Sequence, residues 1–307
     1  VTGYGINFTA DRKNVTIKRC LLVQDNETLG LGVGGGEYAI FFQGLYNSTI
    51  INNTIRTRSD ESHGIFGDAT GGKKIMNTTF SLNNITTFGS TVYGIYAVSG
   101  SNITIVNNTI RQLGASSRGI LFDNANTYSS ANVSNNRIIE EGASSRGIET
   151  KTKGLLATWN FINISGGSAE GINDPTSGGF NFITRNTIVG TNTSLTGIYF
   201  GSVQNSNYSH NNISLNGTSN VGIYIQNSHH NAVTENNVTI YGPGNVDAAA
   251  AGIRTGTGTL QYNTISNNII NTYGNLWAYG IVAQTQYSNV TENFITTTGN
   301  ISHAIEI

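Results

Sequence analysis

The 307-residue chain has little cysteine, proline or charge. Cys20 is its only cysteine, it has two prolines, and 11% of its residues are charged, with a formal net charge of −1. One cysteine cannot form an internal disulfide, and a nearly neutral chain has no electrostatic case for binding nucleic acid or an anionic membrane. No apolar run approaches the roughly 20 residues of a membrane-spanning helix. These absences exclude a disulfide-stapled scaffold, and we expect neither a nucleic-acid partner nor a membrane span.

The sequence is dominated instead by a short repeated phrase. A small residue, usually glycine, is followed by isoleucine twelve times, at separations of 24 to 34 residues. A repeat of this length that runs through the whole chain predicts a solenoid, in which each coil buries its core against its neighbours. The repeating isoleucines are Ile6, Ile40, Ile65, Ile95, Ile120, Ile148, Ile172, Ile198, Ile223, Ile253, Ile281 and Ile305.

A second pattern, asparagine followed two residues later by isoleucine or valine, runs in step with the first. Alternate residues of a strand face the same side, so we expect both residues of each copy to point inward. Stacked asparagines can then hydrogen-bond to their copies in the coils above and below. The predicted asparagine ladder consists of Asn53, Asn83, Asn108, Asn136, Asn160, Asn186, Asn211, Asn236, Asn267 and Asn293.

A third short strand precedes each ladder asparagine, for example at 102–105 and 289–291. No segment shows a 3.6-residue apolar period over ten residues. The sequence therefore predicts an all-β fold, a parallel β-helix (β-solenoid) of about 11–12 coils, with roughly 24–30 residues and three short strands per coil and almost no helix. We expect one continuous domain over residues 1–307, with an atypically long first coil at about residues 6–40.

Two segments, SNITIVNNTI at 101–110 and SNVTENFI at 288–295, carry a family resemblance. They resemble the right-handed parallel β-helix repeats of the pectin-lyase-like superfamily and of many archaeal and bacterial surface proteins. The resemblance covers nearly the whole chain and implies a right-handed solenoid, but it is specific for architecture only. In overall character, the chain is also similar to methanogen-type archaeal sheath and envelope structural proteins.

The resemblance implies polysaccharide cleavage as one function, and one stretch of the chain is similar to those enzymes. Asp60, His63 and Asp68 surround a His-Gly-Ile sequence like that of polygalacturonase-type hydrolases. His63, however, occupies the slot before the repeating Gly–Ile, which holds tyrosine, arginine, glutamate or threonine in other coils. We interpret this slot as a solvated turn and expect no catalytic residue. Asp60, His63 and Asp68 are the catalytic candidates if the chain is a lyase or a glycoside hydrolase.

The other acidic residues, among them Glu140, Glu149, Glu170 and Asp174, are interpreted as solvated charges at turns. Glu149 and Asp174 stand one and two residues after the repeating isoleucine, so we expect them on opposite sides of their strands. The sequence has no cysteine–histidine framework and no glycine-rich phosphate loop. We therefore expect no metal and no cofactor.

Asn-x-Ser/Thr sequons occur 18 times. A chain this rich in asparagine, serine and threonine makes many of them by chance, but the functional interpretation is N-glycosylation of an extracellular surface protein. Because the chain does not begin with methionine, it is expected to be a processed form or an excerpt. The glycosylation candidates are Asn7, Asn14, Asn26, Asn47, Asn52, Asn77, Asn84, Asn102, Asn107, Asn132, Asn163, Asn192, Asn207, Asn212, Asn216, Asn237, Asn289 and Asn300.

The residue after each repeating isoleucine should point outward, and in several coils it is large and apolar. Such a stripe indicates a lateral protein interface or, as a lesser alternative, sugar stacking; coverage by a neighbouring loop is the structural explanation. The interface candidates are Phe41, Phe66, Tyr96, Leu121, Tyr199 and Tyr224. Cys20 is either an inert core residue or the site of an intermolecular disulfide.

The repeat phrase runs to both ends of the chain without an amphipathic capping helix. Bare terminal coils expose strand edges and invite further stacking. We therefore expect a secreted structural protein that carries covalent glycans. It is expected to assemble with itself end to end, with lateral contacts as a further option, into a cell-surface sheath, S-layer-like layer or filament. The alternatives are a polysaccharide-cleaving enzyme and a carbohydrate-binding or adhesive module.

Overall fold

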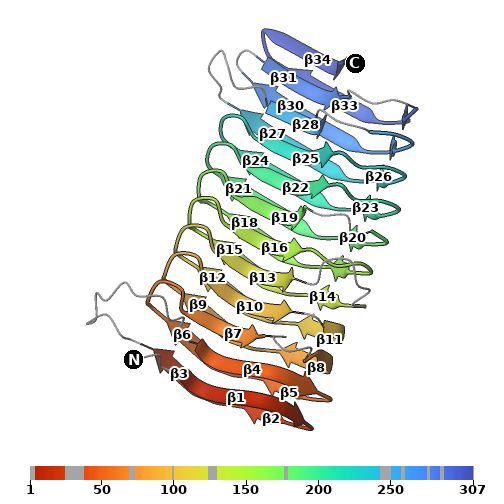
Figure 1. Cartoon of the computed structure of the whole chain (residues 1–307). Helices are drawn as coiled ribbons and strands as arrows, with labels where there is room; N and C mark the ends of the chain where they lie inside the picture. The colour runs from red at the N-terminus through yellow and green to blue at the C-terminus, as the bar shows by residue number, and fades with distance from the viewer. Residues whose placement is uncertain are drawn as a thin grey trace.

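The computed structural model describes residues 4–24, 38–68, 73–98, 100–123, 130–175, 179–242, 250–256, 260–274, 277–283 and 287–306. These residues contain strands, turns and no helix. The strands wind into coils that stack along one axis, with the two chain ends at opposite ends of the stack (Figure 1). The predicted all-β parallel solenoid is therefore confirmed.

Each coil contributes up to three strands, which stack into three columns. The Gly–Ile strands are β1 (Tyr4–Lys13), β4 (Tyr38–Tyr46), β7 (His63–Gly67), β10 (Tyr93–Val98), β13 (Arg118–Asp123), β16 (Arg146–Thr150), β19 (Glu170–Asp174), β22 (Thr196–Gly201), β25 (Val221–Gln226), β28 (Ala250–Thr255), β31 (Trp277–Val282) and β34 (Ile301–Glu306). The short strands are β2 (Thr16–Lys18), β5 (Thr49–Ile51), β8 (Ile75–Ser81), β11 (Gly100–Val106), β14 (Asn132–Ser134), β17 (Leu156–Thr158), β20 (Phe182–Thr184), β23 (Asn207–Ser209), β26 (Ala232–Thr234), β29 (Thr264–Ser266) and β32 (Asn289–Thr291). The Asn–Ile strands are β3 (Leu21–Gln24), β6 (Thr54–Thr57), β9 (Asn84–Thr87), β12 (Thr109–Gln112), β15 (Arg137–Glu140), β18 (Phe161–Ile164), β21 (Thr187–Thr191), β24 (Asn212–Asn216), β27 (Asn237–Gly242), β30 (Ile269–Gly274) and β33 (Phe294–Thr298).

All pairings between these strands are parallel. Each links a strand to its copy in the next coil, except that the end of β4 also pairs with the start of β8. The Asn–Ile strands form an 11-stranded sheet, while the other two columns join into a 23-stranded sheet. The repeating isoleucines are partners in the register, as in Ile95 with Ile120 and Ile120 with Ile148. The period read from the sequence is therefore the register of the solenoid.

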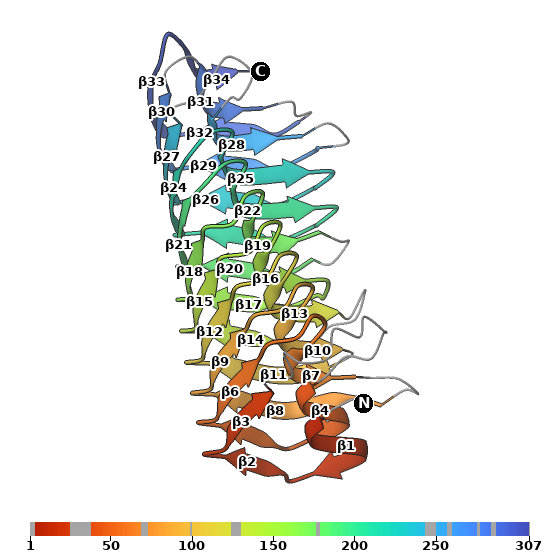
Figure 2. The ribbon, with the colours of Figure 1, turned by 90° about the vertical axis from the view of Figure 1, so that its left-hand side faces the viewer.

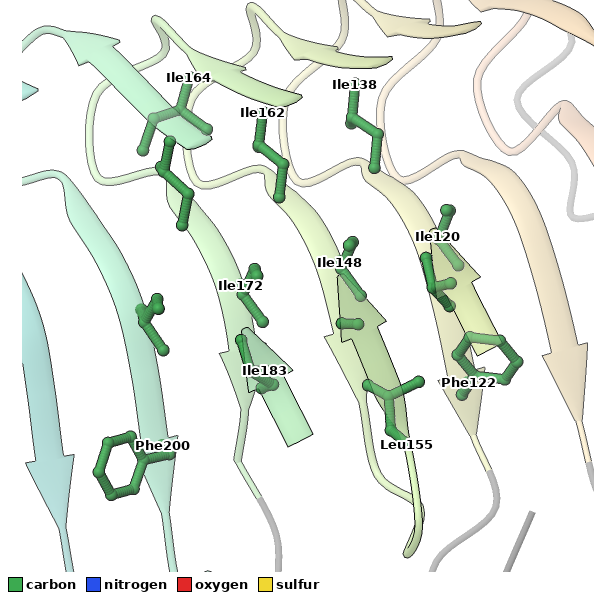
Figure 3. Packing of buried hydrophobic residues seen from close by; sticks show 14 of the residues in the cluster. Ile120, Phe122, Ile138, Ile148, Leu155, Ile162, Ile164, Ile172, Ile183 and Phe200 are labelled. Atoms are coloured by element: carbon green, nitrogen blue, oxygen red, sulfur yellow. The ribbon is translucent and has the colours of Figure 1, made fainter. Parts of the chain in front are cut away.

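Isoleucine fills the interior because alternate residues of all three columns point into it. Ile120, Ile148 and Ile172 follow one another along the stack, and Ile138 and Ile162 pack against them from the Asn–Ile strands (Figure 3). All five are fully buried. The glycine before each isoleucine has a local reason: a Cβ at Gly119 would lie 2.6 Å from the carbonyl oxygen of the next coil.

The asparagine ladder is continuous through ten coils. Each Nδ2 donates to the Oδ1 of the next asparagine, at distances of 2.8 to 3.0 Å. Asn83 shows the full set, because its Nδ2 also donates to the Ile50 carbonyl and its Oδ1 accepts from the backbone N–H and Nδ2 of Asn53. A buried carboxamide that makes all four hydrogen bonds has no unsatisfied polar atom.

One ladder position was predicted wrongly. Asn268 is buried and continues the ladder, whereas Asn267 is exposed and turns the chain with a φ of 56°. Ile270 is accordingly the inward residue, and Ile269 lies half exposed. The sequence Asn267-Asn268-Ile269-Ile270 fits either frame, and pairing of Ile270 with Val238 selects one.

A second polar ladder, absent from the sequence interpretation, runs beside the short strands. Backbone N–H groups there donate to side chains of the next coil, as in Leu155 to Asn181, Asn181 to Ser206 and Ser206 to Asn231. Because serine and asparagine alternate in this role, no single-residue repeat marks it in the sequence. The two ladders together tie successive coils at two corners.

Candidate functional site

The outer face of the Gly–Ile strands is the most varied surface of the solenoid. It is formed by side chains two residues before and one residue after each buried isoleucine, which the parallel register stacks into columns. From β4 to β25 these columns pass from aromatic to charged and back to aromatic residues. We call this surface the outer face.

Its first part is an aromatic cluster on β4, β7 and β10, formed by Tyr38, Phe41, His63, Phe66, Tyr93 and Tyr96. The ring centroids of Phe66 and Tyr96 are 4.5 Å apart, and those of Tyr38 and Phe66 are 4.6 Å apart. Some of the ring pairs are tilted and others are stacked, with centroid separations in the favourable range for aromatic pairs. Phe41 is only 9% exposed as a result, and Leu121 on β13 only 3%. These two interface candidates point outward but are covered, whereas Phe66, Tyr96, Tyr199 and Tyr224 are partly exposed.

His63 lies within this cluster, and its interpretation as a solvated turn residue was wrong. It begins β7, is 6% exposed and stacks on Tyr93 with ring centroids 4.6 Å apart. Its Nδ1 accepts a hydrogen bond from the Tyr93 backbone N–H at 3.1 Å. Burial lowers the pKa of His63 to about 3, so the imidazole is neutral near pH 7.

The other two catalytic candidates lie on either side of His63 in the chain. Asp60 lies on the preceding turn, where its Oδ1 accepts from the backbone N–H of Ser90 at 2.7 Å. Asp68 follows the end of β7, and five residues of extended strand separate it from His63 by roughly 16 Å. Asp60 thus contacts the backbone of the next coil, and Asp68 lies at the opposite end of β7 from His63.

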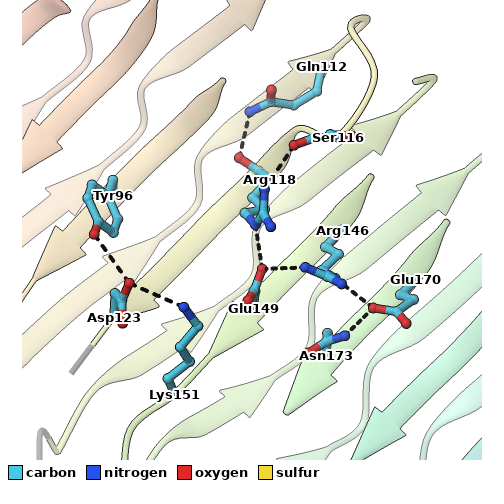
Figure 4. Close-up of polar contacts among 10 residues, drawn as sticks. All are labelled: Tyr96, Gln112, Ser116, Arg118, Asp123, Arg146, Glu149, Lys151, Glu170 and Asn173. Atoms are coloured by element: carbon cyan, nitrogen blue, oxygen red, sulfur yellow. Dashed lines mark hydrogen bonds and ion pairs between the residues drawn. The ribbon is translucent and has the colours of Figure 1, made fainter. Parts of the chain in front are cut away.

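A network of ion pairs forms the middle of the outer face on β13, β16 and β19 (Figure 4). Glu149 accepts from Arg118 Nε at 2.5 Å and from Arg146 Nη1 at 3.1 Å. Arg146 also bonds Glu170 through Nε at 2.7 Å, and Asn173 donates to the same Glu170 oxygen. Two cations and two anions thus alternate along the solenoid axis. We call these five residues the charge network.

Electrostatics keep Glu149 ionised despite its burial. Desolvation by itself would raise the pKa of Glu149, but the hydrogen bonds and positive charges of Arg118 and Arg146 outweigh it and lower the pKa. The contacts of Glu149 therefore require the carboxylate. Its predicted place on the outer side of the strand is confirmed, but it is a buried ion-pair partner rather than a solvated charge.

A second contact joins the charged and aromatic parts of the face. Asp123 accepts from Lys151 Nζ at 3.2 Å and from the Tyr96 hydroxyl at 3.4 Å (Figure 4). The guanidinium of Arg118 also lies 5.7 Å from the ring centroid of Tyr93, within cation–π range. The aromatic cluster and the charge network are therefore continuous.

The far part of the outer face carries two tyrosines held close to the backbone. A Cβ at Gly201 would lie 2.7 Å from the Tyr199 hydroxyl, and one at Gly256 would lie 2.5 Å from the Tyr224 hydroxyl. Glycine at these positions therefore leaves room for each phenol ring to lie over the strand. The Tyr199 hydroxyl also donates to Gln226 Oε1 at 2.6 Å, which fixes the ring.

Two acidic residues that the sequence analysis assigned to solvated turns lie inside the solenoid. Asp174 is fully buried, and its Oδ2 accepts from Tyr208 at 2.9 Å and from Asn181 at 2.8 Å. Burial raises the pKa of Asp174 to about 7, although these two hydrogen bonds oppose the shift. Burial likewise raises the pKa of Glu140 well above its ordinary value. The position of Asp174 two residues after Ile172, on the inward side, is the signal that could have found it.

The sequons follow from the alternation of the strands. Every described sequon asparagine points away from the core, and the middle residue is often an inward isoleucine or valine, as in Asn84-Ile85-Thr86 and Asn237-Val238-Thr239. Outward polar residues spaced by two produce Asn-x-Thr without any role in glycosylation. Asn26 lies outside the described residues, and glycan attachment stays a prediction.

Cys20 occupies the ladder position of the first coil. Its backbone N–H donates to Asn53 Oδ1 at 3.0 Å, as the ladder asparagines do. The thiol is free and partly exposed, and an intermolecular disulfide stays a prediction. In the described ranges, no three His, Cys, Asp or Glu side chains converge where they could hold a metal ion. None of the described segments is a helix long and apolar enough to cross a membrane.

Comparison with known proteins identifies the architecture as one that other proteins share. A family model described as the right handed beta helix region matches residues 1–162, just over half of the chain. No curated protein matches the sequence. Solved structures that match include the tailspike protein of E. coli bacteriophage HK620 in complex with a pentasaccharide, with 12% identity and a TM-score of 0.59. A mutant of that tailspike, also in complex with the pentasaccharide, has 12% identity and a TM-score of 0.63.

Each of these two alignments covers 94% of this chain and 58% of the tailspike chain. The chain therefore spans less than two thirds of the length of these structures. At 12% identity, the likeness shows a shared fold.

Proposed function

The chain belongs to the right-handed β-helix family, and we propose that it is an extracellular surface protein that binds polysaccharide along its outer face. The observation that carries this proposal is the unbroken succession of aromatic cluster, charge network and paired tyrosines. From Tyr38 to Tyr224 it spans seven strand-to-strand steps of about 4.8 Å, or about 34 Å. A sugar chain of several residues matches a surface of this length.

The chemistry of the outer face suits sugars. A pyranose ring has an apolar face of C–H groups, which packs on exposed rings such as Tyr96 and Tyr199, and a rim of hydroxyls. Arginine and carboxylate groups held in fixed ion pairs can donate to and accept from those hydroxyls. The tailspike structures with bound pentasaccharide support the proposal by showing that this fold can present a sugar-binding surface.

We further propose that the protein binds without cleaving. Glycosidases need one protonated and one ionised carboxyl group beside the scissile bond. Glu149 is held ionised by two arginines, and the Glu170 carboxylate is bonded to Arg146 and Asn173. These contacts favour a rigid recognition surface over an acid–base pair.

An array of bacterial surface polysaccharides, followed by calorimetry on the bound member, tests both statements. Tyr199→Ala and Arg146→Ala should each weaken binding at least tenfold, whereas Tyr273→Ala, which removes a ring from the Asn–Ile face, should leave it unchanged. Equal affinities for the three variants would overturn the binding face. Release of reducing ends that Glu149→Gln abolishes would establish an enzyme instead.

End-to-end assembly into a sheath or S-layer-like array is a second candidate. Ile305 on β34 is 44% exposed, whereas its register partner Ile281 is fully buried. Any further coil that pairs with the edge of β34 would bury Ile305 in the same way, and a second copy can supply one. Electron microscopy of the purified chain should show filaments that Ile305→Lys shortens or abolishes; a wild-type preparation without elongated particles at any concentration would rule this candidate out.

A further inference from the structure

The outer side of the short strands is mostly polar, and its large exposed apolar side chains lie on two neighbouring strands. One column of register partners contains mostly threonine and asparagine, with an apolar interruption at β17 and β20. In chain order the column is Thr16, Thr49, Thr79, Thr104, Asn132, Leu156, Phe182, Asn207, Ala232, Thr264 and Asn289. Leu156 and Phe182 are 39% and 52% exposed, and they are direct partners in the parallel register.

Both corners that flank these two strands also carry a large exposed ring. Trp159 follows β17 and is 58% exposed, and Phe180 precedes β20 and is 47% exposed. Both residues have left-handed backbone, with φ of 58° and 57°, a conformation that is unfavourable for bulky residues. We call Leu156, Trp159, Phe180 and Phe182 the apolar island.

The exposure of the apolar island is not a consequence of where the chain ends. β17 and β20 lie in the middle of the stack, with β14 and β23 already paired on either side (Figure 2). Each aromatic side chain carries about 150–250 Å² of surface, so the island presents on the order of 300–400 Å² of exposed apolar area. A patch of this size on a monomer is commonly functional.

We propose that the apolar island is the centre of a two-fold interface with a second copy of this chain, packed sheet face to sheet face. A two-fold axis parallel to the strands and midway between β17 and β20 exchanges the two strands and runs the two solenoids antiparallel. Each large side chain then meets a complementary partner: Phe182 meets Leu156, Phe180 meets Gly154, and Trp159 meets Arg185. No like charges face one another in these three pairs.

Contacts within the chain already show one of these pairings. Arg185 lies 5.5 Å from the ring centroid of Trp159 in the neighbouring coil, so this guanidinium is positioned for cation–π contact at the island edge. Gly154, with a φ of 75°, has no side chain to obstruct an incoming ring. Two islands would bury about 600–800 Å² of apolar surface, and the threonine-rich surface around them extends the contact toward the 1,200–2,000 Å² of a stable interface.

Sedimentation equilibrium of the full chain from about 1 to 100 µM tests the proposal. The wild type should approach twice the 32.7 kDa of one chain, and Phe182→Glu should weaken dimerisation at least 100-fold with unchanged circular dichroism. Tyr241→Glu, a charge placed on an equally exposed ring of the Asn–Ile face, should leave the dimer intact. A monomeric wild type at 100 µM, or a dimer indifferent to Phe182→Glu, would refute it. An open series of larger sizes that persists in Phe182→Glu would indicate end-to-end stacking and would also refute it.

Cross-linking tests the two-fold arrangement directly. In a Cys20→Ser background, Thr104→Cys chains mixed with Ala232→Cys chains should be joined by a bismaleimide with a spacer of about 10 Å, the distance between packed sheets, because these two positions face one another across the proposed axis. Each chain alone should cross-link at least tenfold less, because its cysteine and the copy of that cysteine lie five strand steps, or about 24 Å, apart along the solenoid axis. Equal cross-linking in the unmixed samples would exclude the antiparallel axis.

Discussion

Inside the solenoid, ten successive coils place an asparagine at the same corner, whereas the outer face changes its side chains at almost every coil. The interior repeats because each ladder asparagine takes its hydrogen bonds from the coils above and below it. The outer face has no such constraint, because its side chains mainly contact one another and solvent rather than the backbone groups of the neighbouring coils. The residues that repeat in every coil therefore specify the architecture. The residues that vary from coil to coil form the surface that we propose binds polysaccharide.

Removing a ladder asparagine should produce the largest effect. Asn83→Ala deprives Asn53 and Asn108 of hydrogen-bond partners inside the core and removes a donor to the Ile50 carbonyl. Each buried unsatisfied group costs about 1–3 kcal/mol, so the free energy of unfolding should fall by about 3–5 kcal/mol in denaturant titration. Asn84→Ala, one residue later and exposed, is the control and should change it by less than about 0.5 kcal/mol. Similar losses in both variants would mean that the ladder is not the distinguishing interior feature.

The buried carboxyl of Asp174 should give the next largest effect, and one that depends on pH. Its folded pKa of about 7 lies above the ordinary value of 3.8, so between about pH 4 and 7 the folded state retains a proton that the unfolded state has lost. The free energy of unfolding should therefore fall as pH rises through this window and level off above it. Asp174→Asn, whose carbonyl oxygen can still accept from Tyr208 and Asn181, should be more stable than the wild type at pH 8, on the order of 3 kcal/mol.

Unfolding curves of both proteins from pH 4 to 9 measure this difference. The two stabilities should be closest at the acidic end, where the folded wild-type carboxyl is protonated and the unfolded one regains its proton. Parallel curves across the whole range would show that Asp174 does not titrate in the window expected from its burial.

The smallest expected effect is a stabilisation at a surface corner. Leu82 is exposed and has a φ of 54° in a column that elsewhere contains Asn52 and Asn107. Asparagine tolerates the left-handed conformation better than leucine, so Leu82→Asn should raise the free energy of unfolding by about 0.5–1 kcal/mol. Leu82→Ala keeps the unfavourable backbone and should show no gain. A gain in both variants would point to loss of exposed apolar surface rather than to the backbone.

Much of the fold could be predicted, because every coil of the solenoid must bury side chains at the same positions. The isoleucine positions were readable because a fully buried residue at each copy leaves a fixed period, and the structure confirms them from Ile40 to Ile281. The predicted inward asparagine was wrong at Asn267, because the sequence there has two asparagines followed by two isoleucines. Either residue of each pair could point inward, and only strand pairing determines which one does.

The candidate site was less accessible from the sequence. The positions before and after each isoleucine were identified, but a column that accepts any residue type was interpreted as solvated. His63 is buried because aromatic side chains from the coils above and below close over it. Arg118 and Glu149 meet across coils, 31 residues apart in sequence. No local sequence pattern predicts the burial of His63 or the Arg118–Glu149 ion pair.

The sequence by itself determined the periodic part of this protein: parallel strands, a buried isoleucine stack and an asparagine ladder. These follow from strand alternation and from the requirement that buried polar groups be satisfied, both of which act within one coil and repeat. Only the tertiary structure decided which charges pair on the outer face, that His63 is buried, and that four apolar side chains form an island. These features arise between coils, where residues 24 to 35 positions apart become neighbours about 5 Å away.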